Sequence, residues 1–194
     1  MHAQGRIPNE CTYGIVLDGL CNNHLVEDAL SLFHLVGNNS KLNSNIVVYT
    51  ILIDGAGKNG KVDVARILFQ GLIDKGLQPN VRTYNVMING FCREGQLGKA
   101  KLLFLKMEES GCPPDDVTYR VLLQGYLKNR HYDDVEMLLQ EMDDRCYYSL
   151  DASTLSLFID HIAAGLLDRR SMLKLLGKLV PKELLNDPSL CDWE

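Results

Sequence analysis

The sequence lacks the residue patterns by which many enzymes and zinc proteins are recognised. Its six cysteines form no CxxC pair, and none of its five histidines is followed two positions later by glutamate. It also has no HExxH, Walker-type or GxSxG motif. We therefore predict no catalytic residue, no metal site, no cofactor and no small-molecule substrate.

Long apolar runs and targeting signals are lacking too. No uncharged stretch approaches the roughly 18 apolar residues that cross a bilayer, so no membrane partner is expected. The first ten residues, MHAQGRIPNE, have neither the apolar core of a secretory signal nor the Arg- and Ser-rich character of an organellar presequence. The cysteines are therefore interpreted as reduced thiols.

Basic charge is also scarce. Lys and Arg number 20 against 25 Asp and Glu, which gives a net charge of -5 and a pI of about 5.5. This balance argues mildly against a nucleic-acid ligand, although a local basic stripe can govern binding on an acidic protein. The paired carboxylates are interpreted as helix caps or solvated charge rather than metal ligands. They are Asp115–Asp116, Asp133–Asp134 and Asp143–Asp144.

Self-similarity at a fixed period is the strongest feature that the sequence does have. Tyrosines recur at spacings of 36, 35 and 35 residues, with a glycine six residues later and a small or branched apolar residue sixteen later. A larger apolar residue follows four positions further on. The four columns are Tyr13, Tyr49, Tyr84 and Tyr119; Gly19, Gly55, Gly90 and Gly125; Ala29, Ala65, Ala100 and Val135; and Phe33, Phe69, Phe104 and Leu139. Such a period indicates a repeat protein.

Each repeat reads as a helix, a short break and a second helix. In the third, apolar residues between Tyr84 and Phe91 follow an i, i+3, i+4, i+7 pattern, and a second apolar stripe runs from Leu97 to Met107. Gly95 gives the freedom that a tight turn needs, and Gly111 suits a helix C-terminus. One such hairpin has more apolar face than it can bury alone, so stacking must complete the core. The predicted fold is all-α, an α-solenoid of antiparallel helix-turn-helix hairpins.

The repeat boundaries follow from the tyrosine column. Residues 1–9 resemble the tail of an absent preceding repeat, residues 151–180 a degenerate terminal repeat or cap, and residues 181–194 a C-terminal tail. In the terminal repeat, Thr154 and Asp160 stand in the Tyr and Gly columns. The four full repeats are predicted at 10–45, 46–80, 81–115 and 116–150.

These residues resemble the pentatricopeptide repeat family, and the uniform spacing resembles its P-type subclass. The stretch NVRTYNVMINGFCREGQLGKAKLLFLKMEESGCPPD matches the family's repeat pattern almost throughout. The later stretch QEMDDRCYYSLDASTLSLFIDHIAAG is similar to the C-terminal region of plant restorer-of-fertility-like members. The resemblance covers residues 5–150 well and 151–180 weakly. Tetratricopeptide repeats, which bind peptides, have a period of about 34 and a different Trp, Leu-Gly, Tyr signature.

The resemblance implies that residue 5 of each repeat and the last residue of the repeat together read one RNA base. The legible pairs are Thr50 with Asn80 for adenine, and Asn85 with Asp115 for uracil with some tolerance of cytosine. Gly14 with Asn45 is interpreted as a weak purine preference, and Arg120 with Leu150 matches no pair. The predicted core, 5′ to 3′, is (A)-A-U/C.

Two further columns complete the predicted RNA contacts. In the family, residues at position 2 sandwich each base; here they are Cys11, Val47, Arg82 and Val117. The family places phosphate contacts at position 13, which holds Lys58, Arg93 and Lys128. Position 13 of the first repeat is Asn22. Without the resemblance, ordinary helix packing and solvated cations near helix C-termini explain the same residues.

The sequence therefore predicts a non-enzymatic, single-stranded RNA-binding protein for organellar RNA processing, stability or translation. The resemblance implies a mitochondrial location first and a chloroplast second, with other RNA-processing proteins as further partners. Two rivals stay open. One is a protein-interaction α-solenoid, which the acidic pI favours and the basic column opposes. The other is a truncated family member with little autonomous function.

Overall fold

In the computed structural model, residues 9–37, 44–145 and 150–167 are described. These residues form nine α-helices and no β-strand, as the period predicted. The chain divides into two compact units, residues 1–113 and residues 114–194. The helices are α1 Glu10–Asn22, α2 Val26–Gly37, α3 Ile46–Lys58, α4 Val62–Asp74, α5 Val81–Arg93, α6 Leu97–Glu109, α7 Asp116–Lys128, α8 Tyr132–Asp144 and α9 Ala152–Ala163. None of them is long and apolar enough to span a bilayer.

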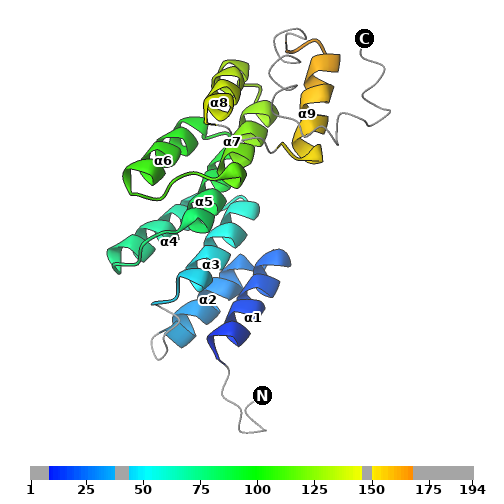
Figure 1. Cartoon of the computed structure of the whole chain (residues 1–194). Helices are drawn as coiled ribbons and strands as arrows, with labels where there is room; N and C mark the ends of the chain where they lie inside the picture. The colour runs from blue at the N-terminus through cyan, green and yellow to red at the C-terminus, as the bar shows by residue number, and fades with distance from the viewer. Residues whose placement is uncertain (1–8, 38–43, 146–149, 168–194) are drawn as a thin grey trace. The chain divides into compact units, whose positions relative to one another are not determined.

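The first unit consists of three stacked helical hairpins, α1–α2, α3–α4 and α5–α6 (Figure 1). The first helices of the hairpins pack side by side, α1 against α3 and α3 against α5. The second helix of each hairpin also contacts the first helix of the next, α2 against α3 and α4 against α5. This is the stacking of an α-solenoid, in which each hairpin buries its neighbour's apolar face.

The columns found in the sequence form the core of this stack. Phe33 meets Tyr49 edge-on at 5.4 Å between ring centroids, and Phe69 meets Tyr84 in the same way at 5.5 Å. Each pair joins the second helix of one hairpin to the first helix of the next. The small column lies at the hairpin centre, where Ala29, Ala65 and Ala100 are at most 1% exposed.

Turns end the first helices at a residue in the left-handed region. Gly60 has φ +73° and Gly95 has φ +69°, which confirms the turn predicted at Gly95. The first and fourth repeats place His24 and Arg130 at the same point, with φ of +64° and +60°. A side chain in this conformation costs roughly 1–2 kcal/mol, so these two turns are less favourable than the glycine turns.

The glycine column marks a close approach of neighbouring first helices. A Cβ added at Gly55 would lie 2.4 Å from the Sγ and 2.5 Å from the Cβ of Cys21 on α1. At the next interface, a Cβ on Gly57 would lie 3.3 Å from the Cα of Gly90. A side chain at Gly55 would therefore overlap Cys21, and one at Gly57 would contact Gly90 tightly.

The second unit contains the α7–α8 hairpin, with α9 packed against α7. The residue that caps the start of α9 is Asp151, whereas a strict 35-residue count ends the fourth repeat at Leu150. Leu150 is instead a core residue, 1% exposed. If the repeats are aligned on the residues that cap their first helices, the fourth repeat ends at Asp151, one residue after the predicted boundary. In this capping register Thr154 aligns with Thr118 rather than with the tyrosines. The predicted tail, 181–194, lies outside the described residues.

Asp151 gives a testable contribution to the stability of this unit. Burial opposes ionisation of its carboxyl, but hydrogen bonds from Thr154 and Ser153 and the nearby Arg120 charge lower its pKa below the usual value. Asp151→Ala is expected to lower the free energy of unfolding by about 1 kcal/mol at pH 7, measured by urea titration.

The sign of the pH dependence follows from the lowered pKa. The charged cap contributes fully above the unfolded-state pKa, about 3.9, and its contribution is lost as the pH falls through the folded-state pKa. Asp151→Asn keeps an accepting oxygen and is the matched control, expected to retain most of the stability with no such acid dependence. Equal losses for both variants at pH 7 would contradict the cap.

Candidate functional site

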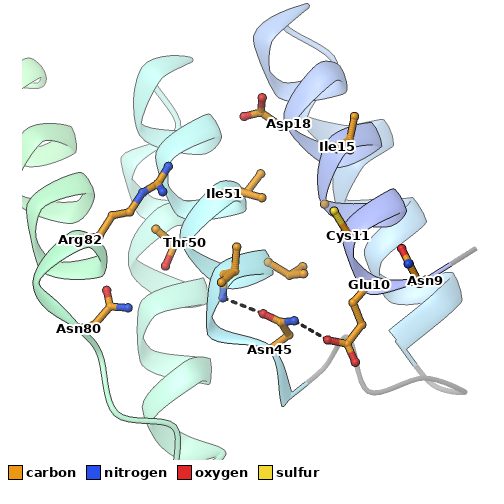
Figure 2. Close-up of a pocket in the computed structure, with 13 residues that line it drawn as sticks. Asn9, Glu10, Cys11, Ile15, Asp18, Asn45, Thr50, Ile51, Asn80 and Arg82 are labelled. Atoms are coloured by element: carbon orange, nitrogen blue, oxygen red, sulfur yellow. Dashed lines mark hydrogen bonds between the residues drawn. The ribbon is translucent and has the colours of Figure 1, made fainter.

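A groove of about 770 Å³ runs along the first helices of the first unit (Figure 2). We call it the N-terminal groove; α1, α3 and the start of α5 line it. Seven of the residues predicted to contact RNA line it together: Cys11, Gly14, Asn45, Val47, Thr50, Asn80 and Arg82. The structure thus brings predicted base-reading and base-sandwiching positions of successive repeats to one surface.

The position-2 side chains of the first unit line this groove and are exposed. Val47 is 57% exposed, and Cys11 and Arg82 are exposed as well. In the second unit, Val117 is 42% exposed on α7. Apolar side chains left open at one repeat position are available for stacking, as the predicted sandwich requires.

The position-5 residues are more buried than a freely solvated helix face. Thr50 is 5% exposed, Asn85 is 7% exposed, and Gly14 is buried too. The Thr50 hydroxyl lies 2.8 Å from the Thr83 hydroxyl on α5, because neighbouring first helices pack closely here. Of these residues, Thr50 and Gly14 line the N-terminal groove.

Thr50 and Asn80, the predicted adenine pair, are joined through Thr83. Asn80 Oδ1 lies 3.0 Å from the Thr83 hydroxyl, which in turn lies 2.8 Å from the Thr50 hydroxyl. Thr83 is fully buried and was not among the predicted contacts. The structure therefore holds the two predicted reading residues of repeat 2 in one hydrogen-bonded chain.

The last residue of a repeat also caps the next first helix. Asn80 Oδ1 accepts from the backbone N–H of Thr83 at 2.9 Å, and Asp115 Oδ1 accepts from the backbone N–H of Thr118 at 2.8 Å. Each cap thus uses one side-chain oxygen. The Asn80 amide nitrogen and the Asp115 Oδ2 atom are not part of these bonds.

Asn45 differs from Asn80 at the equivalent place. Its Oδ1 accepts from the backbone N–H of Val47 at 2.9 Å, and its Nδ2 donates to Glu10 Oε2 at 2.6 Å (Figure 2). Both ends of the amide are therefore engaged. The predicted reading pair of repeat 1 thus has no side chain at Gly14 and an occupied amide at Asn45.

Arg120, in the second unit, is also engaged. Its Nη1 lies 3.4 Å from Asp151 Oδ2, and its side chain is 25% exposed. By the capping register, Asp151 rather than Leu150 is the counterpart of Asn80 and Asp115. The fourth repeat therefore carries an Arg–Asp ion pair at its predicted reading position.

The position-13 cations are all exposed at the ends of first helices. Lys58 and Arg93 close α3 and α5 in the first unit, and Lys128 closes α7 in the second. Lys58 Nζ forms an ion pair at 2.5 Å with Asp54 Oδ2, one turn earlier. Asp54 is thus a paired carboxylate rather than a simply solvated one.

Chemistry of other kinds has little support in the described part of the chain. No group of three or more His, Cys, Asp or Glu side chains is arranged there to hold a metal ion. Cys11, Cys21, Cys92 and Cys112 are free thiols, and Cys21 and Cys92 are buried packing residues. Cys146 and Cys191 lie outside the described residues.

The comparison with protein families decides the identity of the repeats. The PPR repeat family model matches residues 44–93 and 79–128, and two further PPR repeat models match residues 4–35 and 117–147. Together these matches cover well over half of the chain. The chain belongs to the pentatricopeptide repeat (PPR) family. No curated protein sequence matches it.

Solved PPR structures share its fold. Maize PPR10 superposes with a TM-score of 0.72 at 22% identity, over 92% of this chain and 26% of PPR10. PPR10 in complex with an 18-nt psaJ RNA element gives 0.74 at 21% identity, over 92% of this chain and 27% of that one. The PPR domain of Arabidopsis thaliana protein-only RNase P 1 (PRORP1), in complex with tRNA, gives 0.61 at 21% identity, over 84% of each chain. The chain thus spans about a quarter of the length of PPR10.

The PPR pattern alone did not identify the carboxylates that form hydrogen bonds or ion pairs with the predicted RNA-contacting residues. Glu10, Asp54 and Asp151 hold Asn45, Lys58 and Arg120 respectively. Only the pairing of Asp54 with Lys58 has a local signal, the i, i+4 spacing of opposite charges on one helix. The other two join separate helices and depend on packing.

Proposed function

We propose that the chain is a sequence-selective single-stranded RNA-binding protein that reads one base per repeat. The observation that carries the proposal is the geometry of the repeat-ending caps, in which one side-chain oxygen of Asn80 and of Asp115 accepts the helix hydrogen bond. On this basis Thr50 with Asn80 reads adenine, and Asn85 with Asp115 reads uracil or cytosine. The proposed core is (A)-A-U/C.

The capping bonds give the amide and the carboxylate opposite recognition properties. Because Asn80 Oδ1 accepts from Thr83, the group that can meet a base is the amide nitrogen, which only donates. A donor suits the N1 acceptor of adenine. The Asp115 cap also uses Oδ1, and a carboxylate oxygen only accepts. An acceptor suits the N3–H of uracil or the amino group of cytosine.

The wider role is proposed from the likeness to proteins whose structures contain RNA, PPR10 with an RNA element and PRORP1 with tRNA. We propose that the chain acts by occupying RNA in the processing, stability or translation of an organellar transcript, in mitochondria or, as a second choice, chloroplasts. It would recruit other RNA-processing proteins rather than catalyse a step itself. Membership of the P-type, restorer-of-fertility-like group is part of this proposal.

A protein-binding solenoid is the second candidate, and one observation favours it. Ile67 on α4 and Leu102 on α6 occupy the same repeat position and are 64% and 68% exposed. Two apolar side chains in register on second helices are suitable for a protein contact. This surface lies on helices other than those of the N-terminal groove, so it is compatible with RNA binding.

The base-reading proposal is tested by recoding the third repeat. Asn85→Thr combined with Asp115→Asn creates the combination found at Thr50 and Asn80, so preference at that base should change from uracil to adenine by about 3- to 10-fold. The physical reason is the exchange of an acceptor for a donor at the base edge. Binding to short single-stranded RNAs containing A-A-U or A-A-A, measured by fluorescence anisotropy at low salt, gives the result.

The matched control is Asp116→Asn, which changes the same charge one residue away on α7. It should leave base preference unchanged. RNA binding with no change in preference on recoding would contradict base reading, and no salt-dependent RNA binding by the unmodified chain would contradict the RNA-binding function itself.

A further inference from the structure

The cation of the second repeat is already paired within the protein. Lys58 Nζ lies 2.5 Å from Asp54 Oδ2 on the same face of α3. The Asp54 side chain is only 25% exposed, and the Lys58 side chain is 46% exposed. Ion pairs of this i, i+4 kind are weak, so an RNA phosphate can compete for the lysine but must displace a carboxylate.

The other repeats differ at the equivalent position. One turn before Arg93 stands Asn89, and one turn before Lys128 stands Gln124, both neutral. Among the described residues, neither Arg93 nor Lys128 forms an ion pair. Within the described part of the chain, these two cations therefore have no paired carboxylate to displace.

The first repeat keeps the carboxylate and lacks the cation. Asn22 stands at the cation position and donates to Asp18 Oδ2 at 3.1 Å. Asp18 also lines the N-terminal groove. Repeats 1 and 2 together therefore present two carboxylates and one lysine along this edge of the first unit.

We propose that Asp54 is a positioning residue that holds Lys58 away from RNA and so weakens the phosphate contact of the second repeat. The inference rests on the proposed RNA-binding function and deepens it, because it assigns unequal strength to contacts that the repeat pattern treats as equal. Arg93 is then the first unopposed phosphate contact in the first unit. Asp54 regulates affinity without touching RNA itself.

The electrostatics of a neighbouring group support this reading. Burial raises the pKa of the Cys21 thiol, Asp18 and Asp54 raise it further, and Lys58 lowers it. The two carboxylates and the lysine thus act on the same small region where α1 meets α3. The Lys58 charge that an approaching phosphate would meet is therefore offset by the Asp54 carboxylate beside it.

The test compares charge removal at two positions of the same hairpin. Asp54→Asn is expected to raise the affinity for a single-stranded A-A-U RNA about fivefold at 0.1 M salt and to steepen the salt slope by up to about 0.7, the contribution of one phosphate on a single strand. Asp63→Asn on α4 removes an equal charge, 80% exposed and off the groove, and should change affinity less than twofold. Asp54→Glu keeps the carboxylate, so this variant should bind RNA with the affinity and the salt slope of the unmodified chain.

A double-mutant cycle assigns the effect to Lys58. In a Lys58→Ala background, Asp54→Asn should raise the RNA affinity no more than Asp63→Asn does. An equal gain with and without Lys58, or equal gains from Asp54→Asn and Asp63→Asn, would overturn the inference while leaving RNA binding intact. Failure of the unmodified chain and of every variant to bind RNA at low salt would instead overturn the proposed function and this inference with it.

Discussion

Arg93→Ala combined with Lys128→Ala is expected to lower the affinity for every single-stranded RNA about 25-fold at 0.1 M salt. Under the proposed function, each unopposed cation would neutralise one phosphate and contribute about 0.7 to the salt slope on a single strand. The slope should therefore fall by about 1.4. Because phosphates are the same in every sequence, base preference at the third repeat should not change. Anisotropy titrations at four salt concentrations with A-A-U and scrambled RNAs measure both quantities.

The control removes two cations from second helices instead. Arg66 on α4 and Lys99 on α6 are exposed, and their joint replacement by alanine should lower affinity less than threefold. Adding Lys58→Ala to the double variant should cost little more, because Asp54 already holds that lysine. Equal losses for the two double variants would show that net charge, rather than the position-13 column, governs binding.

Gly55→Ala is expected to lower the free energy of unfolding of the chain by about 2 kcal/mol. The new methyl group would overlap Sγ and Cβ of Cys21 at 2.4 and 2.5 Å, so α1 and α3 must separate. Overpacking of this kind costs about 1–3 kcal/mol, offset in part by the better helix propensity of alanine. Urea titration followed by circular dichroism gives the value.

The repeat itself supplies a matched control for this substitution. Gly19 stands in the same column on α1. Apart from its chain neighbours and the backbone of its own helix, no described atom lies within 4 Å of a Cβ added there. Gly19→Ala should therefore stabilise the chain by up to about 1 kcal/mol. Cys21→Gly should recover much of the loss in the Gly55→Ala background; a lack of coupling between the two would contradict the contact.

The fold was predictable because the residues that recur every 35 positions are the ones that pack in the core. Tyr49 and Phe33 recur where neighbouring hairpins contact one another, and Ala65 recurs at the buried centre of a hairpin. The predicted repeat boundary at 150 differs by one residue from the cap of α9 at Asp151, because a count at fixed period cannot detect one added residue. Only the capping oxygen of Asp151 reveals the register.

The sequence predicted which positions make up the candidate site. It did not predict which of their polar side chains are already bonded to other residues of the protein. The family pattern placed Asn45, Asn80 and Lys58 on the groove side, and the structure locates them there or at the adjacent helix end. The pattern could not indicate that Asn45 donates a hydrogen bond to Glu10, since these residues are 35 positions apart and belong to different hairpins. Availability depends on tertiary neighbours, which vary between repeats while the pattern does not.

The double use of the repeat-ending side chain limits how such a protein can evolve. Asn80 and Asp115 must keep an oxygen for the helix, so most of the twenty amino acids are excluded at that place by stability alone. Exchange between Asn and Asp keeps the cap and replaces a donor with an acceptor toward the base. Under the proposed function, natural selection could therefore alter the preferred nucleotide through exchanges between these two residues that keep the helix cap.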